Sequence, residues 1–300
     1  MMNTKNRIRT PVEDRILYIV NAVIISLFTL VIAIPLWYII VSSFSSGQAI
    51  LQQRVYLWPV DITLNGYKAV FSHKYILTSY RNTIFYTVVG TLINITLTLV
   101  CAYPLSRKDF PFRRFFMILM TITMFFGGGL VPTYLVNVSL GLIDNVWVML
   151  IPGAMSVYYM ILVRTFMISS VPYELFEAAS IDGCSDAYYF FKILLPLLKP
   201  IIAVVTMYYA VGHWNEYFTA MIYLSDQTLF PLQLILRDIL VSSKVSLSEI
   251  HDAQLLASMI GLEALLKYAL IIVSTVPILL IYPFAQKYFV KGVMVGSLKG

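Results

Sequence analysis

Long stretches without charged residues dominate the pattern of this chain. A helix needs roughly 18 consecutive apolar residues to cross the hydrocarbon core of a bilayer. Five charge-free stretches reach that length and a sixth is interrupted only by Glu216: residues 16–53, 82–106, 115–143, 145–163, 268–286 and, with that acid, 200–225. Even the longer stretches include flanking loop and are too short for two helices and a turn. The pattern predicts an all-α membrane protein with six transmembrane helices, at about 16–41, 84–104, from 115 onward, 146–168, 201–224 and 268–284.

Composition supports the bilayer as the solvent of this chain. Hydrophobic residues make up 59% of its 300 positions and charged residues only 12%, whereas soluble proteins carry roughly a quarter charged residues. The net charge of +6 would suggest nucleic acid in a soluble protein, but here no nucleic-acid partner is predicted. Lys5, Arg7 and Arg9 precede the first apolar run as in a signal peptide. No small-residue cleavage site follows and the run is too long, so it is predicted to stay as the first span.

The distribution of basic residues predicts the orientation. Lys and Arg are enriched in cytoplasmic loops of membrane proteins. With a cytoplasmic N-terminus, 14 of the 21 basic residues fall inside. The seven outside are Arg54, Lys68, Lys74, Arg81, Arg237, Lys244 and Lys267. We therefore expect both termini in the cytoplasm.

A run of three glycines interrupts the third predicted span. Gly127, Gly128 and Gly129 follow the start of the third span near Phe115, and each glycine costs a helix about 1 kcal/mol relative to alanine. The helix is expected to loosen or end there. One interpretation is a simple helix end. The other is a flexible element beside a translocation path, where irregular backbone is tolerated against protein or water.

The cytoplasmic segment 169–199 is the longest polar insertion, and it has the pattern of two short helices. Pro172 suits a first helical position, and Glu174 and Glu177 suit the first turns, where the helix dipole favours negative charge. Asp182 and Gly183 supply a turn. Ser185 or Asp186 can cap a second helix, which is expected to run to Leu195 before Pro196 bends the chain into the fifth span, near 201–224.

This segment contains Glu177-Ala178-Ala179, then three residues, Gly183, nine residues and Ile193-Leu194-Leu195-Pro196. The pattern resembles the EAA signature of ABC importer permeases in its full spacing. The segments 171–175, 214–218 and 286–300 resemble the MalG-type permeases of carbohydrate importers. Segments 128–135 and 231–233 are similar, more narrowly, to the LplC/YtcP branch, which is associated with oligosaccharides from plant or algal polysaccharides. The resemblance covers almost the whole chain after about residue 70.

The resemblance implies a type I ABC importer permease fold and a location in a bacterial plasma membrane. It also implies a second homologous permease, two ATPase subunits, an extracytoplasmic solute-binding protein and an oligosaccharide substrate. ATP and Mg²⁺ would bind to the ATPases and no cofactor to this chain, which lacks the GxxxxGK[ST] loop. The residues expected to couple to an ATPase are Glu174, Glu177, Ala178, Ala179, Asp182, Gly183, Ile193, Leu195 and Pro196. Leu175, Phe176 and Ile181 are candidates for filling apolar pockets on that partner.

Candidates for the substrate path lie in the second and fifth spans. Glu216 is the only acid within a predicted span, and such acids are functional hypotheses by default. In one interpretation Glu216 is structural, either paired with the partner permease or close to the outer interface. In the other, Asn215 or Glu216 contacts a sugar hydroxyl while Trp214 or Tyr217 stacks on the sugar ring. Asn94 fits an interhelical hydrogen bond or a ligand contact. His213 fits packing.

The basic tail 286–300, with Lys291, Gly292 and Gly296, fits either lipid headgroups or, by the resemblance, the ATPase dimer. The expected organisation is residues 1–78 with the first span and an external loop, 79–285 with spans two to six and the coupling loop 169–199, and the tail.

Other function classes have less support. A secondary transporter would show coupling acids and internal repeats. A membrane enzyme would show clustered acids or histidines, whereas His73, His213 and His251 are scattered, and Cys101 and Cys184 have no paired or metal-ligand spacing. No catalytic residue and no metal site are predicted. A permease of the same ABC class for a solute other than a sugar stays open.

Overall fold

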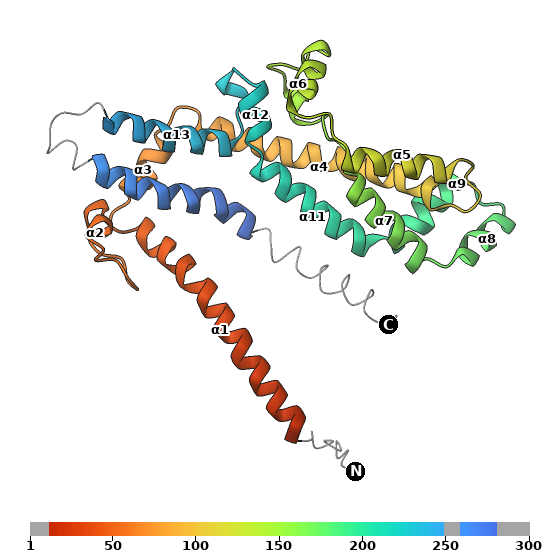
Figure 1. Cartoon of the computed structure of the whole chain (residues 1–300), viewed down its shortest axis with the longest axis horizontal. Helices are drawn as coiled ribbons and strands as arrows, with labels where there is room; N and C mark the ends of the chain where they lie inside the picture. The colour runs from red at the N-terminus through yellow and green to blue at the C-terminus, as the bar shows by residue number, and fades with distance from the viewer. Residues whose placement is uncertain (1–11, 249–258, 281–300) are drawn as a thin grey trace. The chain divides into compact units, whose positions relative to one another are not determined.

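A computed structural model describes residues 12–248 and 259–280, and every element in this part of the chain is helical. Figure 1 shows the order of the helices. They divide between two compact units, whose described parts are residues 12–70 with 243–248 and 259–272, and residues 71–242 with 273–280.

The first unit holds α1 (Val12–Ser43), α2 (Gly47–Leu51) and α3 (Asn65–Phe71). The first span was predicted at about 16–41, and α1 confirms it with Pro35 inside the helix. Most of α1 is exposed and apolar, as expected of a helix that faces lipid. Its last turn joins a small core of Val41, Ala49, Ile50, Val55 and Leu265.

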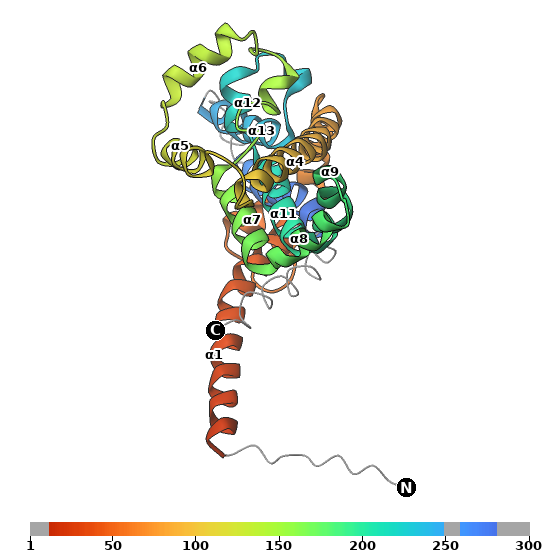
Figure 2. The same cartoon turned by 90° about the vertical axis from the view of Figure 1, so that its right-hand side faces the viewer.

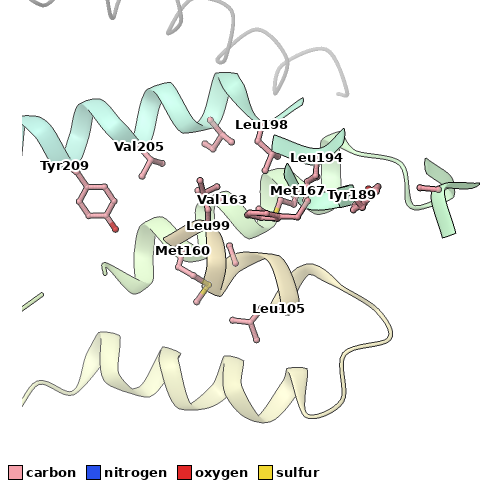
Figure 3. Close-up of a cluster of buried hydrophobic side chains, with 14 residues drawn as sticks. Leu99, Leu105, Met160, Val163, Met167, Tyr189, Leu194, Leu198, Val205 and Tyr209 are labelled. Atoms are coloured by element: carbon pink, nitrogen blue, oxygen red, sulfur yellow. The ribbon is translucent and has the colours of Figure 1, made fainter. Parts of the chain in front are cut away.

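The second unit is built around three helices, α4 (Ile76–Ser106), α7 (Val157–Ser170) and α11 (Lys199–Asn215). They lie side by side in both views (Figures 1 and 2). Their shared core holds Leu99 and Leu105 of α4, Met160 and Val163 of α7 and Val205 of α11, which meet in Figure 3. Helix α4 contains the second predicted span, 84–104, and extends it at both ends.

Two of the predicted spans are broken in the structure. Helices α5 (Arg113–Phe125) and α6 (Leu130–Ser139) meet at an angle of 113° across the three glycines. Gly129 has a φ of +84°, which explains why the turn needs a glycine. The predicted loosening of the third span is confirmed.

The fourth span, predicted at 146–168, is wrong as a single helix. A 3₁₀ turn (Val146–Met149) is followed by irregular chain and then by the 14-residue α7. Pro152 lacks the N–H that a helix would use, and Gly153 adopts a φ of +74°, so the helix starts only at Val157.

The predicted count of six spans is not confirmed. Among the described residues, three helices are long and apolar enough to cross a bilayer: Asp14–Ser43, Ile76–Ser106 and Met259–Leu280. The count rises to five if each bent pair is one span. The last helix starts at Met259, earlier than the predicted 268, so Glu263 and Lys267 lie in a helix and not in a loop, and they form an ion pair of 3.0 Å.

The remaining elements connect these helices. They are α8 (Tyr173–Ile181), α9 (Asp186–Tyr188), a π-helical turn (Tyr189–Leu194), α10 (Leu195–Leu197), α12 (Phe218–Tyr223), a 3₁₀ turn (Gln227–Leu229) and α13 (Leu232–Ser248). Thr83 of α4 accepts a hydrogen bond of 2.7 Å from the N–H of Leu232, which fixes the start of α13 against α4.

Candidate coupling site

Helix α8 begins and ends where the sequence pattern predicts. Pro172 is its N-cap, one residue before the predicted position, and Glu174 lies in the first turn. At the other end Gly183 has a φ of +76°, its N–H donates to Ser180, and the N–H of Cys184 donates to Ala179. These two bonds form a Schellman motif, which satisfies carbonyls that the helix end leaves free.

The second half of the loop is also helical, in three pieces. The Ser185 hydroxyl accepts a hydrogen bond of 3.2 Å from the N–H of Tyr188, so Ser185 is the N-cap. The π-helical turn and α10 continue this helix to Leu197, and α11 then leaves at 80°. Pro196 was expected to make the bend, which lies two residues later at Leu198. Pro200 has no N–H to donate to the carbonyl of Pro196, so the helix cannot continue straight.

The two faces of α8 have different surroundings. Glu174, Glu177 and Ala178 are exposed, and among the described residues neither carboxylate has an ion-pair partner. Ala179 is buried, with 7% of its surface exposed, in the core that α4, α7 and α11 share. Ile181 is 87% exposed. The outward face therefore offers two carboxylates and an apolar side chain to a partner.

Aromatic side chains attach α8 to the segment that follows α4. The guanidinium carbon of Arg107 lies 3.0 Å from the centre of the Phe176 ring, and the Phe176 and Tyr189 rings meet edge to face at 5.2 Å. The ammonium of Lys108 lies 4.5 Å from the centre of the Tyr173 ring. Phe176 thus packs inside this chain, while Leu175 and Ile181 point to its surface.

Arg107 is held in place by Asp109, which accepts hydrogen bonds of 3.1 and 3.0 Å from it. The guanidinium lowers the pKa of the Asp109 carboxyl, chiefly through these bonds, so the pair stays charged at neutral pH. Only 8% of the Arg107 surface is exposed. Sequence reasoning used Arg107 only to assign orientation. Tyr173 and Phe176 are three positions apart and therefore lie on one face of a helix. This spacing was the available signal for an aromatic surface on which a cation could pack.

The other predicted coupling residues are distributed between surface and core. Asp182, Gly183 and Pro196 are exposed, whereas Ile193 and Leu195 are partly buried against the core of Figure 3. The structure thus brings together an exposed set on α8 and its turn, and a second set that joins the loop to α4 and α7.

The substrate-path candidates mostly bond within the chain. Asn94 is 2% exposed, and its Nδ2 donates to the carbonyl of Ala154 at 2.7 Å. Its Oδ1 must therefore accept from Nε2 of His213, at 2.6 Å, which sets the tautomer of that ring. Trp214 is 5% exposed and donates to the carbonyl of Ser274.

Glu216 lies in the break between α11 and α12 and not within a helix. Its carboxylate accepts a hydrogen bond of 2.8 Å from the N–H of Thr219 and so caps α12. Asn215 donates to the carbonyl of Val211, and Tyr217 is 41% exposed. The tail candidates Lys291, Gly292 and Gly296 lie outside the described residues. Among those residues, no group of three side chains of His, Cys, Asp or Glu could hold a metal ion.

Comparison with protein families matches residues 75–295 to the family described as "Binding-protein-dependent transport system inner membrane component". That range includes the whole coupling loop and the three central helices.

Two relatives come from Bacillus subtilis (strain 168). The chain is 38% identical over 274 residues to the polygalacturonan/rhamnogalacturonan transport system permease protein YtcP, covering 91% of this chain and 95% of that protein. It is 39% identical over 267 residues to Protein LplC, covering 89% of each.

A solved structure also aligns with most of the chain. It is the crystal structure of a bacterial ABC transporter involved in the import of the acidic polysaccharide alginate. The TM-score is 0.80 at 36% sequence identity, and the alignment covers 93% of this chain and 99% of that chain.

Proposed function

Since this chain belongs to the inner-membrane components of binding-protein-dependent transport systems, we propose that it imports oligosaccharides that contain uronate sugars. One observation carries the substrate class: the relatives that align over about nine-tenths of the chain include a transporter of polygalacturonan and rhamnogalacturonan and one of alginate. Galacturonan and alginate are acidic polymers, so the shared chemistry of the solutes is a sugar ring with a carboxylate.

In the proposed assembly, this chain pairs with a second permease, receives its solute from an extracytoplasmic binding protein and is driven by two ATPases. The exposed Glu174, Glu177 and Ile181 of α8 support a protein contact there. The attachment of Phe176 and Tyr173 to Arg107 and Lys108 supports force transfer from α8 into α4. The coupling loop and both termini face the cytoplasm in this arrangement, and ATP hydrolysis belongs to the partner subunits.

The polar groups of Asn94, Trp214 and Glu216 are used within the chain, so we assign them to the support of the path and not to its lining. Tyr217, which is 41% exposed, is the remaining aromatic candidate for stacking on a sugar ring.

The test is the ATPase activity of the reconstituted importer with its binding protein, measured with oligogalacturonate, with alginate oligosaccharides and with neutral malto-oligosaccharides. We expect stimulation by an acidic oligosaccharide and none by the neutral ones. Carboxyl-reduced oligogalacturonate of the same length is the matched control and should not stimulate. If no sugar stimulated hydrolysis while another class of solute did, the carbohydrate assignment would be lost and the permease assignment would stand.

A further inference from the structure

A cavity of about 800 Å³ lies beside α8, which we call the coupling helix. Its walls come from the end of α4, the loop to α5, the first turn of α5, the end of α7, the first half of α8 and the π-helical turn. All of these elements belong to the second unit.

Among the residues that the structure describes, four basic side chains and one acid line this cavity. The basic residues are Arg107, Lys108, Arg113 and Arg164, and the acid is Glu174. Within residues 12–248 and 259–280, Arg107 has Asp109 as its ion-pair partner, and the other three have no carboxylate within ion-pair distance. The cavity therefore carries excess positive charge.

The arginines are fixed by the backbone and still have donors to offer. Nε of Arg164 donates to the carbonyl of Leu105 at 2.7 Å, and Nη1 of Arg113 donates to the carbonyl of Arg107 at 3.2 Å. A guanidinium has five N–H donors in a rigid fork, so each arginine keeps others for a ligand. Their positions do not depend on a ligand being present.

The first turn of α8 adds to this positive potential. Residues Val171 to Glu174 line the cavity, and the N-cap Pro172 supplies no side-chain acceptor for the first N–H groups. A helix N-terminus carries about half a positive charge and its free N–H groups bind anions. The cavity thus combines four cations with a helix end, which is the chemistry of a phosphate site.

The cavity lies at the level where two apolar helices end. Ser106 is the last residue of α4 and Ser170 the last of α7, and both line it. Met167, Ile168 and Leu194 give it an apolar wall next to the cations. Headgroups occupy this level of a bilayer, and basic pockets on the cytoplasmic side of membrane proteins bind anionic lipid headgroups.

We propose that this cavity binds the phosphate of an anionic phospholipid and so fastens the root of the coupling helix to α4, α5 and α7. The cytoplasmic leaflet follows from the orientation proposed above. A soluble phosphate shares the anion chemistry, but the apolar wall and the position at the helix ends favour a lipid. The bound lipid would brace Tyr173 and Phe176, through which α8 is attached.

The experiment is native mass spectrometry of the assembled, detergent-solubilised importer, titrated with phosphatidylglycerol or phosphatidylcholine. We expect retention of phosphatidylglycerol over phosphatidylcholine. Each of Arg113→Gln and Lys108→Gln should weaken retention roughly fivefold, the effect expected for one basic residue near an anionic surface. Arg114→Gln is the matched control, because Arg114 is exposed on the same helix and does not line the cavity.

Three results would overturn the lipid assignment. Equal losses with Arg113→Gln and Arg114→Gln would mean diffuse surface attraction. Equal retention of the two lipids would mean that charge does not select the ligand. Binding of inorganic phosphate by the lipid-free importer, with no preference for phosphatidylglycerol, would assign the cavity to a soluble anion. Because the readout is lipid retention and not transport, it is independent of the proposed sugar.

Discussion

The polar side chains of the coupling loop and those around Trp214 differ in whether they are hydrogen-bonded within this chain. On α8, Glu174 and Glu177 point outward and are exposed. Around α11, His213, Trp214 and Glu216 all bond to other parts of the same chain. The coupling loop leaves its two carboxylates available to a partner, whereas the polar groups around α11 are hydrogen-bonded within the fold.

This difference separates a docking surface from a support. An exposed carboxylate is hydrated by water and needs no partner within the protein. A buried amide must form its hydrogen bonds within the protein. Asn94 and His213 satisfy each other and join α4 to α11. Substitutions in the two regions should therefore fail in different ways: the first should lose association and keep the fold, and the second should lose stability.

The largest effect should come from reversing a charge on the exposed face of α8. We expect Glu177→Lys to abolish co-purification of the ATPase, because a cation replaces the carboxylate offered to the partner, while insertion and thermal stability stay unchanged. Glu177→Gln keeps the shape and should retain part of the association. Normal co-purification of the ATPase with the lysine variant would remove Glu177 from the coupling surface.

A close helix contact gives the next largest effect, on stability. A Cβ added at Gly90 of α4 would lie 2.5 Å from Nε2 of His213. Overpacking of this kind typically costs about 1–3 kcal/mol, so Gly90→Val should lower the thermal midpoint of the purified protein. Gly212→Val is the control, since a Cβ there meets no atom within 4 Å. Equal midpoints for the two variants would contradict the predicted contact.

The amide of Asn94 should matter somewhat less. Asn94→Leu removes the bonds to Ala154 and His213, and interhelical hydrogen bonds in membranes contribute about 0.6 kcal/mol each, up to about 1.7. Thermal stability should fall with little change in the ratio of transport to ATP hydrolysis. Thr96→Val, which loses only a bond within its own helix, is the control. A lost sugar response with unchanged stability would instead return Asn94 to the substrate path.

The turn after α8 should show a smaller, conformational effect. Gly183 needs its positive φ, but a Cβ there would meet no atom within 4 Å. Gly183→Ala should therefore cost about 1 kcal/mol from the backbone alone. Gly183→Asn should cost less, because asparagine adopts this conformation more readily. Hydrogen exchange at Cys184 would measure the opening of the turn, and equal exchange in the two variants would argue against strain.

The smallest effect should be a pH dependence of local stability around Asp144, in the loop after α6. The N–H groups of Asp226 and Ser225 donate to Asp144 at 2.9 Å and lower the pKa of its carboxyl. A carboxyl with a lowered folded pKa contributes stability above its unfolded pKa, about 3.9, and loses it as the pH falls through the folded value. Amide protection at these two residues should fall in acid, and Asp144→Asn should remove that dependence.

Much of the coupling loop could be read from local sequence, because short-range rules decide it. Helix α8, the turn at Gly183 and the cap at Ser185 depend on residues within a few positions of each other. The Pro152-Gly153 break of the fourth span was a local signal that the charge-free stretch obscured. The length of an apolar run measures what lipid tolerates, not where a helix begins.

The sequence by itself determined that this chain lies in a membrane, that a polar loop separates two of its apolar segments and that the loop carries the EAA signature. Hydropathy and residue spacing carry that information without any long-range contact. Only the tertiary structure decided that Trp214 donates to the carbonyl of Ser274, that Asn94 binds His213 and that Arg107 lies over Phe176. These contacts join residues up to 119 positions apart, so no local pattern specifies which side chains are bound within the fold.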